Sequence, residues 1–286
     1  MALINAGQNE FLLPDWLRRC AQNYPDRLAL RMGSTGLSFA ELDRRVTILA
    51  AHLATLGIHA GDRVALLAAN SLDYAVFVHA LMRLGAILVP LNVRLTADEL
   101  AWQITDTQAT LLVHDVAHAE LAIQIAQRTQ EAQSAPAVTP SLLETLIADS
   151  VKAPEDSGSL PSSDLIDLAA TQAIIYTSGT TGRPKGARIT YGMHWWNAIG
   201  SALNLGLRED DLWLACLPFY HIGGLSILMR SVIYGMSVSV YERFDAQAIH
   251  AEMLAGEVSL ISVVAVTLQR LLAEFDQPDA RYPDWL

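Results

Sequence analysis

The stretch Ile174-Ile175-Tyr176-Thr177-Ser178-Gly179-Thr180-Thr181-Gly182-Arg183-Pro184-Lys185-Gly186 decides how this sequence is interpreted. An apolar run that favours a β-strand leads into hydroxyl residues, glycines and two cations, and no acidic side chain interrupts them. Glycines allow positive φ angles and let backbone N–H groups turn inward, while hydroxyls and cations add donors and positive charge. The 174–186 stretch therefore predicts a loop that binds an anion with several oxygens, such as a nucleotide polyphosphate.

The 174–186 stretch has two other possible interpretations. A Walker phosphate loop needs a lysine followed by serine or threonine, whereas Lys185 lies between Pro184 and Gly186. A surface turn without a ligand would also contain glycine and threonine, but it would not need this ordered set of hydroxyls, glycines and cations. The phosphate-binding loop is therefore the preferred prediction.

The order Tyr-Thr-Ser-Gly-Thr-Thr-Gly-x-Pro-Lys-Gly in this stretch resembles the phosphate-binding signature of the adenylate-forming superfamily. That superfamily includes acyl-CoA synthetases, luciferases and the adenylation domains of nonribosomal peptide synthetases. The resemblance implies that ATP, with Mg²⁺ as cofactor, activates a carboxylic acid to an acyl-adenylate, and that CoA is the thiol co-substrate. It also implies that Lys185 is catalytic and that Thr181 contacts the metal. The implied nucleotide contacts are Thr177, Ser178, Gly179, Thr180, Thr181, Gly182, Arg183 and Lys185.

A second motif, Pro218-Phe219-Tyr220-His221-Ile222-Gly223-Gly224, follows a predicted strand at 212–217. In open α/β sheets ligands bind beyond the carboxyl ends of the strands, so this position favours a functional histidine as much as a structural one. The motif also resembles the Leu-Pro-x-x-His-x-x-Gly pattern of the superfamily, as does the 88–94 segment. The resemblance implies that His221 is catalytic and that His221, Gly223 and Gly224 shape the acyl pocket.

The segments 192–202 and 221–235 look like those of the 2-succinylbenzoate–CoA ligase family of menaquinone biosynthesis. A keto-diacid aryl substrate needs an aromatic wall and a donor or cation for its second carboxylate. We therefore expect substrate contacts from Trp196, Ser226 and Arg230. Core packing of both Trp195 and Trp196 is the favoured interpretation of that pair, and an exposed Arg230 is an equal alternative to a substrate contact. Another aryl or fatty acid as substrate, and a non-catalytic interaction module, also remain open.

The fold class follows from the order of apolar segments. Between residues 63 and 114 short apolar runs alternate with helical patterns, which predicts an α/β fold of parallel-sheet layers with helices on both faces. We expect a helix over 11–24, a hairpin over 28–37, and capping boxes at Ser38 and Thr96. We expect one subdomain at 1–170, with an irregular excursion at 130–164 that contains a brief helical pattern over 142–147, and a second at 171–286. Asp73 and His79 are interpreted as residues on the surface of a helix.

Composition limits the partners. The 286 residues are 52% apolar and carry a formal net charge of −11, which argues against nucleic acid or an anionic membrane as the main partner. Cys20 and Cys216 are far apart and belong to no CxxC motif, so we interpret both as buried apolar residues. The apolar regions 74–91 and 260–268 fail as membrane spans. We expect small-molecule partners, a cytoplasmic location and a possible homo-oligomer.

The last expectation concerns the extent of the chain. Superfamily members continue through an adenine-contacting strand and a C-terminal lid domain that carries a catalytic lysine. This sequence ends at Leu286, before those motifs. We therefore expect a truncated N-terminal domain of an adenylate-forming enzyme, incomplete at its C-terminus, that has little activity alone.

Overall fold

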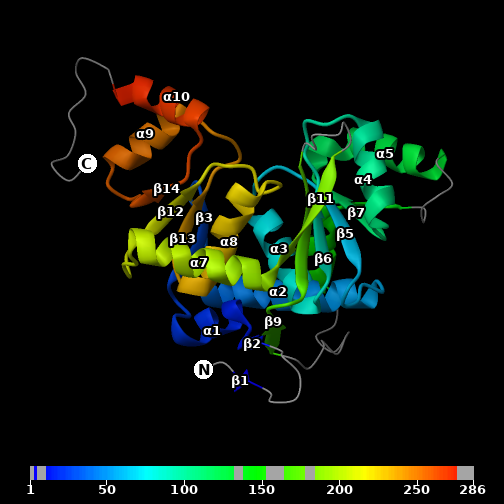
Figure 1. The fold of residues 1–286 in the computed structure, drawn as a ribbon, viewed down its shortest axis with the longest axis horizontal. Coiled ribbons are helices and arrows are strands. Elements are labelled where there is room, and N and C mark those ends of the chain that lie inside the picture. Colours follow the sequence, from blue (N-terminus) through cyan, green and yellow to red (C-terminus); the bar gives the residue numbers. More distant parts are fainter. Residues whose placement is uncertain (1–2, 5–10, 132–137, 153–163, 178–183, 276–286) are drawn as a thin grey trace.

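Two larger β-sheets and the helices packed around them make up most of the molecule (Figure 1). The computed structural model describes residues 3–4, 11–131, 138–152, 164–177 and 184–275. The first sheet has the strand order β11-β10-β6-β5-β7-β8, and the second has the order β14-β12-β13-β3-β4. Most neighbouring strands run parallel, which confirms the predicted α/β fold.

The central strands of the first sheet are short, apolar and mostly buried, as expected for parallel strands covered by helices, whereas the edge strand β11 is mostly exposed. Its strands are β5 (Arg63–Leu67), β6 (Ile87–Pro90), β7 (Leu111–His114), β8 (Pro140–Leu142), β10 (Thr171–Thr177) and β11 (Lys185–Thr190). Its helices are α3 (Leu72–Leu84), α4 (Ala97–Thr107), α5 (Ala119–Glu131) and α6 (Leu143–Lys152), and the short 3-10 helix η1 (Val116–His118) precedes α5.

The second sheet joins the hairpin near the N-terminus to strands from the last third of the chain. Its strands are β3 (Leu28–Met32), β4 (Thr35–Ser38), β12 (Leu212–Ala215), β13 (Ser237–Val240) and β14 (Leu260–Ile261). The helices of this half are α7 (Tyr191–Leu205), α8 (Ile222–Tyr234), α9 (Ala246–Leu254) and α10 (Ala265–Phe275). The predicted hairpin is confirmed by the antiparallel pairing of β3 with β4.

The first helix begins later than the sequence pattern indicates. Instead of one helix over 11–24, residues Phe11–Pro14 form β2, and α1 covers Trp16–Asn23. Strand β2 pairs with β1 (Leu3–Ile4) and β9 (Leu165–Asp167) in a small antiparallel sheet, so long-range pairing overrides the local helical pattern. Asp15 then caps α1 by accepting a hydrogen bond from the Arg18 backbone N–H.

The predicted irregular excursion at 130–164 is wrong for residues 138–152. Strand β8 pairs in parallel with β7 and becomes the edge of the first sheet, and α6 packs against α2 (Phe39–Thr55). Leu143 and Leu146 are buried there, so this segment contributes to the core. Residues 153–163 lie outside the described part of the chain.

Each of the two larger sheets contains strands from both sides of residue 170. Strands β10 and β11 follow that residue but belong to the first sheet, whereas β3 and β4 precede it and belong to the second. The division between the sheets therefore does not coincide with the predicted subdomain boundary. The division into subdomains 1–170 and 171–286 stays a prediction.

The capping signals at three helix ends are confirmed. Capping boxes form at Ser38 with Glu41 and at Thr96 with Glu99, and Gly85 ends α3 in the left-handed conformation with φ of 69°.

Helix α3 is apolar on nearly all sides, as expected for a helix packed between layers. His79 is buried within it at 2% exposure, so the expectation of a surface residue was wrong. Burial lowers the pKa of His79 to about 4.

The N-terminal helices are joined by a buried charge cluster. Arg83 at the end of α3 forms ion pairs with Asp15, which caps α1, and with Asp43 in α2.

Cys20 and Cys216 are both buried free thiols, as predicted. Within the described ranges, every helix falls short of the length and hydrophobicity needed to cross a bilayer.

Candidate functional site

The 174–186 stretch forms a β-hairpin. Strand β10 ends at Thr177, β11 begins at Lys185, and these two residues are cross-strand partners. Thr177 and Lys185 are therefore brought together at the base of the connecting loop, where both are exposed. The remaining predicted nucleotide contacts lie outside the described residues, and so does the proposed metal contact of Thr181; these are Ser178, Gly179, Thr180, Thr181, Gly182 and Arg183.

A cavity of about 460 Å³ opens beside the base of this hairpin. Thr177 and Pro184, the described residues at either end of the loop, line it together with Tyr220 and His221. The two motifs singled out in the sequence therefore share one cavity. Its other lining residues are Pro90, Asn92, Leu95, Glu99, Gln103 and Tyr176.

The end of β10 is held in place from the side. The Tyr176 hydroxyl donates a hydrogen bond of 2.5 Å to Asp106, and its ring meets Trp102 edge-on with centroids 5.5 Å apart. Burial, together with the Asp106 carboxylate, raises the pKa of Tyr176 well above its ordinary value, so the phenol stays protonated and can donate. These contacts fix the strand end from which the loop departs.

His221 is the N-cap residue of α8 and makes no side-chain capping bond there. Its ring contacts Tyr220 edge-on at 4.7 Å between centroids. Burial, and then the nearby positive charge of Arg94, lower the pKa of His221 below 6.5. The imidazole is therefore neutral at neutral pH, with one nitrogen able to donate and the other able to accept.

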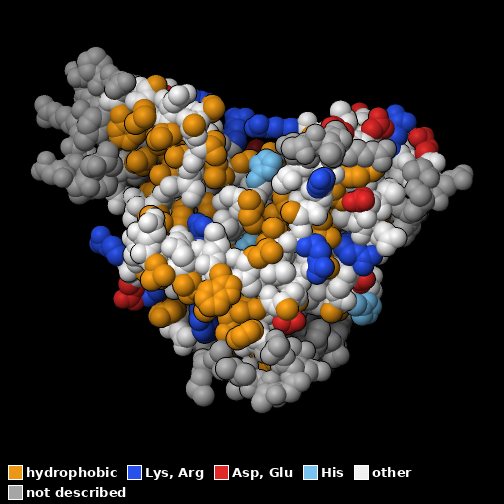
Figure 2. Space-filling model, in the orientation of Figure 1, with side chains coloured by type: hydrophobic (Ala, Val, Ile, Leu, Met, Phe, Trp, Pro, Cys, Tyr) orange, Lys and Arg blue, Asp and Glu red, His pale blue; other side chains and the backbone are white. Residues whose placement is uncertain are grey.

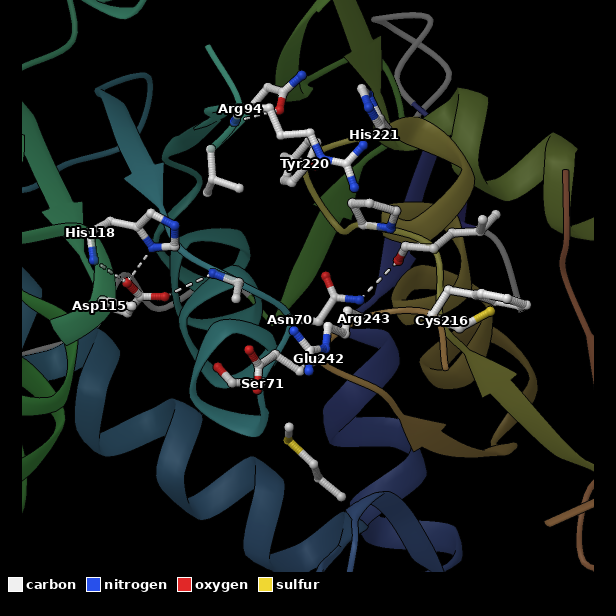
Figure 3. Close-up of a pocket in the computed structure, with 18 of the residues that line it drawn as sticks. Asn70, Ser71, Arg94, Asp115, His118, Cys216, Tyr220, His221, Glu242 and Arg243 are labelled. Atoms are coloured by element: carbon white, nitrogen blue, oxygen red, sulfur yellow. Dashed lines mark hydrogen bonds and ion pairs between the residues drawn. The ribbon is translucent and has the colours of Figure 1, made fainter. Parts of the chain in front are cut away.

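Arg94 was missed as a site residue by the sequence analysis. It belongs to the segment after β6, and in Figure 3 its guanidinium extends toward Tyr220 and His221. Among the described residues no carboxylate forms an ion pair with Arg94. The only sequence signal was the resemblance of the 88–94 segment, which assigned no role to this residue.

A larger cleft of about 1050 Å³ adjoins the first cavity at Asn92, Tyr220 and His221 (Figure 3). Residues that follow the carboxyl ends of β5, β7, β12 and β13 line it, which is the edge at which parallel sheets bind ligands. Charged residues of both signs face it: Asp73, Arg94, Asp115, Glu144, Glu242, Arg243 and Arg270. Asp73, expected to be a helix-surface residue, is part of this lining.

Asn70 connects the two sheets and positions the His221 segment. Its amide nitrogen donates to the carbonyls of Leu217 and Tyr241 at 2.9 and 3.0 Å, and its oxygen accepts from the Phe219 N–H at 2.8 Å. Asn70 is only 3% exposed, so these bonds satisfy a buried amide. In the sequence, only the position of Asn70 after a predicted strand indicates this role.

On the opposite wall of the cleft, Asp115 and His118 form a pair. His118 Nδ1 lies 2.5 Å from Asp115 Oδ1, and the other carboxylate oxygen accepts from the Ala69 N–H. The carboxylate therefore fixes the orientation of the imidazole, and both residues line the cleft. No group of three or more His, Cys, Asp or Glu side chains in the described ranges could hold a metal ion.

The predicted acyl-pocket residues other than His221 are not part of the lining of either cavity. Gly224 packs so closely on the preceding segment that an added Cβ would be 2.3 Å from the Pro218 carbonyl oxygen. Gly223 accepts the hydrogen bond of the buried Ser226 hydroxyl through its carbonyl. Arg230 donates to Asn197 and lies over the Trp213 ring at 5.0 Å, which makes it a partly buried link between α7 and α8.

Trp196 is 68% exposed, whereas its neighbour Trp195 stacks on Trp16 in the core. Core packing of both tryptophans was therefore wrong for Trp196. The substrate contacts of Trp196, Gly223, Gly224, Ser226 and Arg230 stay predictions.

Comparison with known proteins places this geometry in context. The model of the AMP-binding enzyme family matches residues 17–284. The chain is 42% identical over 277 residues to a 2-succinylbenzoate–CoA ligase of Geobacillus kaustophilus, covering 95% of this chain and 51% of that protein. It is 38% identical over 260 residues to the enzyme of that name from Bacillus cereus, covering 91% and 50%. The chain thus spans about half the length of these relatives.

Solved structures show the same fold. The o-succinylbenzoate CoA synthetase of Bacillus subtilis in complex with the acyl-adenylate intermediate OSB-AMP matches with a TM-score of 0.81 and 34% identity, over 92% of this chain and 51% of that one. Its complex with ATP and magnesium ion matches with a TM-score of 0.80 and 32% identity, over 96% and 68%. A putative long-chain fatty acid CoA ligase from Rhodopseudomonas palustris matches with a TM-score of 0.80 and 26% identity, over 93% and 66%. Because the family model matches nearly the whole chain, from residue 17 to residue 284, the chain belongs to the AMP-binding enzyme family.

Proposed function

We propose that the protein containing this chain activates a carboxylic acid with ATP to an acyl-adenylate and pyrophosphate, and then transfers the acyl group to the thiol of CoA. The observation that supports this most directly is the shared cavity of Thr177, Pro184 and His221. In this cavity the base of the loop predicted to bind a polyphosphate lies next to His221, which follows the end of strand β12.

The chemistry explains why these residues are needed. The first step brings a carboxylate against a phosphate, so two anions must be brought together and the transition-state charge stabilised. Lys185 stands at the mouth of the loop, and Arg94 lies beside His221; both are positive and can screen this repulsion. His221, kept neutral by its lowered pKa, can orient the acid or a phosphate oxygen by hydrogen bonding without adding a charge that titrates near neutral pH.

Mg²⁺ would enter with ATP and neutralise part of the triphosphate charge. Its main ligands would be the phosphate oxygens, as is usual for magnesium at nucleotide sites. Thr181 remains the predicted protein contact. No step of the proposed mechanism requires a covalent nucleophile from the protein.

We further propose 2-succinylbenzoate as the acid, which would place the protein in menaquinone biosynthesis. The support comes from the relatives of that name. The cleft is large enough for an aryl diacid, since small-molecule sites commonly measure about 300–1,000 Å³. The positive charges of Arg94, Arg243 and Arg270 could receive a second carboxylate.

ATP–pyrophosphate exchange on the full-length protein tests the proposal. The acids are 2-succinylbenzoate, benzoate and palmitate, each with and without CoA trapping of the product. We expect exchange with 2-succinylbenzoate alone. Exchange with palmitate or benzoate instead would keep the adenylation chemistry and reject the substrate, and no exchange with any acid would reject the ligase activity.

A further inference from the structure

The side-chain amide of Asn70 uses both of its N–H bonds in the floor of the larger cleft (Figure 3). The nitrogen donates to the carbonyls of Leu217 and Tyr241, and the oxygen accepts from the Phe219 N–H. Asn70 follows β5 of the first sheet, whereas its three partners follow β12 and β13 of the second. One amide therefore joins segments from both sheets at the edge where parallel sheets bind ligands.

The orientation of His221 depends on the backbone that carries it. The imidazole makes no capping bond at the start of α8. The backbone is fixed, because the His221 N–H donates to the Pro218 carbonyl at 3.1 Å and the His221 carbonyl accepts from the Leu225 N–H at 2.9 Å. The position of the ring is therefore set by the turn at 217–221, between β12 and α8.

Asn70 holds this turn from the side of the first sheet. Among the described residues, it is the one side chain that hydrogen-bonds to the backbone of the turn. Phe219 is fully buried, and its ring packs on Tyr74 of α3 with centroids 5.4 Å apart. Without the Asn70 amide, the Phe219 N–H would be buried with no acceptor, which favours a shift of the turn toward water.

The same amide fixes the segment that carries Glu242 and Arg243. Both residues line the cleft, and they directly follow Tyr241, whose carbonyl accepts from Asn70. The Tyr241 N–H in turn donates to the Ala215 carbonyl at 3.0 Å, so the segment leaves the second sheet from a fixed point. Asn70 therefore sets where His221 lies relative to these two charged side chains.

We infer that Asn70 is a positioning residue for adenylation, whose amide holds His221 and the Glu242–Arg243 segment in the arrangement that the reacting acid requires. It acts through these residues and not by touching the substrate. The inference rests on the proposed function for the reaction, whereas the placement of His221 by Asn70 can be measured without activity. A displacement of about 1 Å in such an arrangement can slow a reaction by about 10²-fold.

Asn70→Ala in the full-length protein tests the inference. We expect kcat for ATP–pyrophosphate exchange with 2-succinylbenzoate to fall by about 10²-fold. The KM for ATP should stay within about twofold of the native value, because the loss falls on the reacting arrangement and not on nucleotide binding. Urea unfolding establishes that each variant is folded under the assay conditions.

The matched control is Gln172→Ala. Gln172 is 1% exposed, its amide oxygen lies 3.1 Å from His194 Nε2, and it is not part of the lining of either cavity. Its replacement also removes a buried amide, so it should lower stability but leave kcat per folded molecule unchanged. Equal losses of kcat in Asn70→Ala and Gln172→Ala would overturn the inference.

Asn70→Asp separates hydrogen bonding from shape. The substitution keeps the size of the side chain but turns the donating nitrogen into a second acceptor. The carboxylate would face two carbonyl oxygens at neutral pH, so this variant should be impaired as strongly as Asn70→Ala. Near-native kcat in Asn70→Asp would show that shape alone suffices, and the inference would then be wrong.

The titration of His221, followed by NMR, measures its placement directly. Burial is the main cause of the lowered pKa of His221, and Arg94 beside the ring adds to it. In Asn70→Ala the turn should shift toward water and the pKa should rise toward 6.5, whereas Gln172→Ala should leave it in place. An unchanged titration in Asn70→Ala would overturn the positioning role. If the native protein exchanges with no acid, the proposed function fails, and this titration alone decides whether Asn70 places the ring.

Discussion

Arg94 and His221 are far apart in the sequence, yet the fold places the guanidinium beside the imidazole. Burial is the main cause of the lowered His221 pKa, and Arg94 adds to it by repelling the imidazolium. The two residues therefore act on one electrostatic environment at the junction of the two cavities.

Replacing Arg94 should be visible in the titration of His221. In Arg94→Gln we expect the pKa of His221 to rise toward 6.5, because the repulsion disappears while the burial remains. The acidic limb of the pH profile for ATP–pyrophosphate exchange should move to higher pH by the same amount. Arg94→Lys keeps the charge and should leave the limb in place. An unchanged limb in Arg94→Gln would show that the two groups are not coupled.

Lys185 should matter for chemistry and little for folding. Its side chain is exposed at the start of β11, so Lys185→Ala should change the free energy of unfolding by no more than about 0.5 kcal/mol. Loss of a cation at the loop should slow ATP–pyrophosphate exchange by about 10²-fold or more. The control is Arg188→Ala, which removes an exposed cation further along the same strand. Equal loss of exchange in both variants would mean that general charge, and not Lys185, is responsible.

At the scale of elements, the N-terminus of α8 depends on a close backbone approach. Gly224 lies where a Cβ would come within 2.3 and 2.6 Å of the carbonyl oxygens of Pro218 and Leu217. Helix α8 can therefore pack on the segment that carries His221 only because this residue has no side chain. The helix position and the orientation of His221 are linked through this contact.

Two glycine-to-alanine substitutions separate close approach from helix propensity. Gly224→Ala should lower the free energy of unfolding by about 1–3 kcal/mol, because the backbone must shift to relieve the overlap, and should also reduce exchange activity. A Cβ added at Gly200 has no neighbouring atom within 4 Å, so Gly200→Ala should raise the free energy of unfolding by about 0.5–1 kcal/mol through better helix propensity. Urea unfolding of both variants measures the difference. Equal effects of the two substitutions would contradict the role given to Gly224.

For the whole molecule, acid stability should depend on buried histidines. Burial lowers the pKa of His79 and of His194 to about 4, from an ordinary value of 6.5. The unfolded chain therefore binds more protons between these values. The stabilising effect of the neutral rings is complete above pH 6.5 and is lost as the pH falls toward 4. Each histidine accounts for a loss on the order of 3 kcal/mol over that range.

His79→Leu tests this dependence. Both ring nitrogens of His79 lack a partner among the described residues, so an apolar side chain should be tolerated at pH 7. The variant should lose less stability than the native protein between pH 7 and pH 4, by about the share of one histidine. Urea unfolding at several pH values gives the slopes, and identical slopes for His79→Leu and the native protein would refute the assignment.

The sequence alone determined what short-range chemistry encodes. The capping boxes at Ser38 and Thr96, the hairpin at 28–37 and the strand–loop–strand form of the 174–186 stretch follow from steric and hydrogen-bonding preferences of a few neighbouring residues. The ordered motif of that stretch was also enough to identify the family, because the match of the family model confirms it.

Only the tertiary structure decided which distant segments meet. Strands β10 and β11 pair within the first sheet, although they follow residue 170. Strand β8 and helix α6, which lie in the predicted irregular excursion, pack against the core. Asn70 hydrogen-bonds to the segment that carries His221 and so connects the two sheets. It also put Arg94 beside His221 and left Trp196 exposed while its neighbour Trp195 is packed. The physical reason is that these contacts are selected by burial summed over the whole chain, and a local pattern records that a residue is apolar or charged but not which distant residue it will meet.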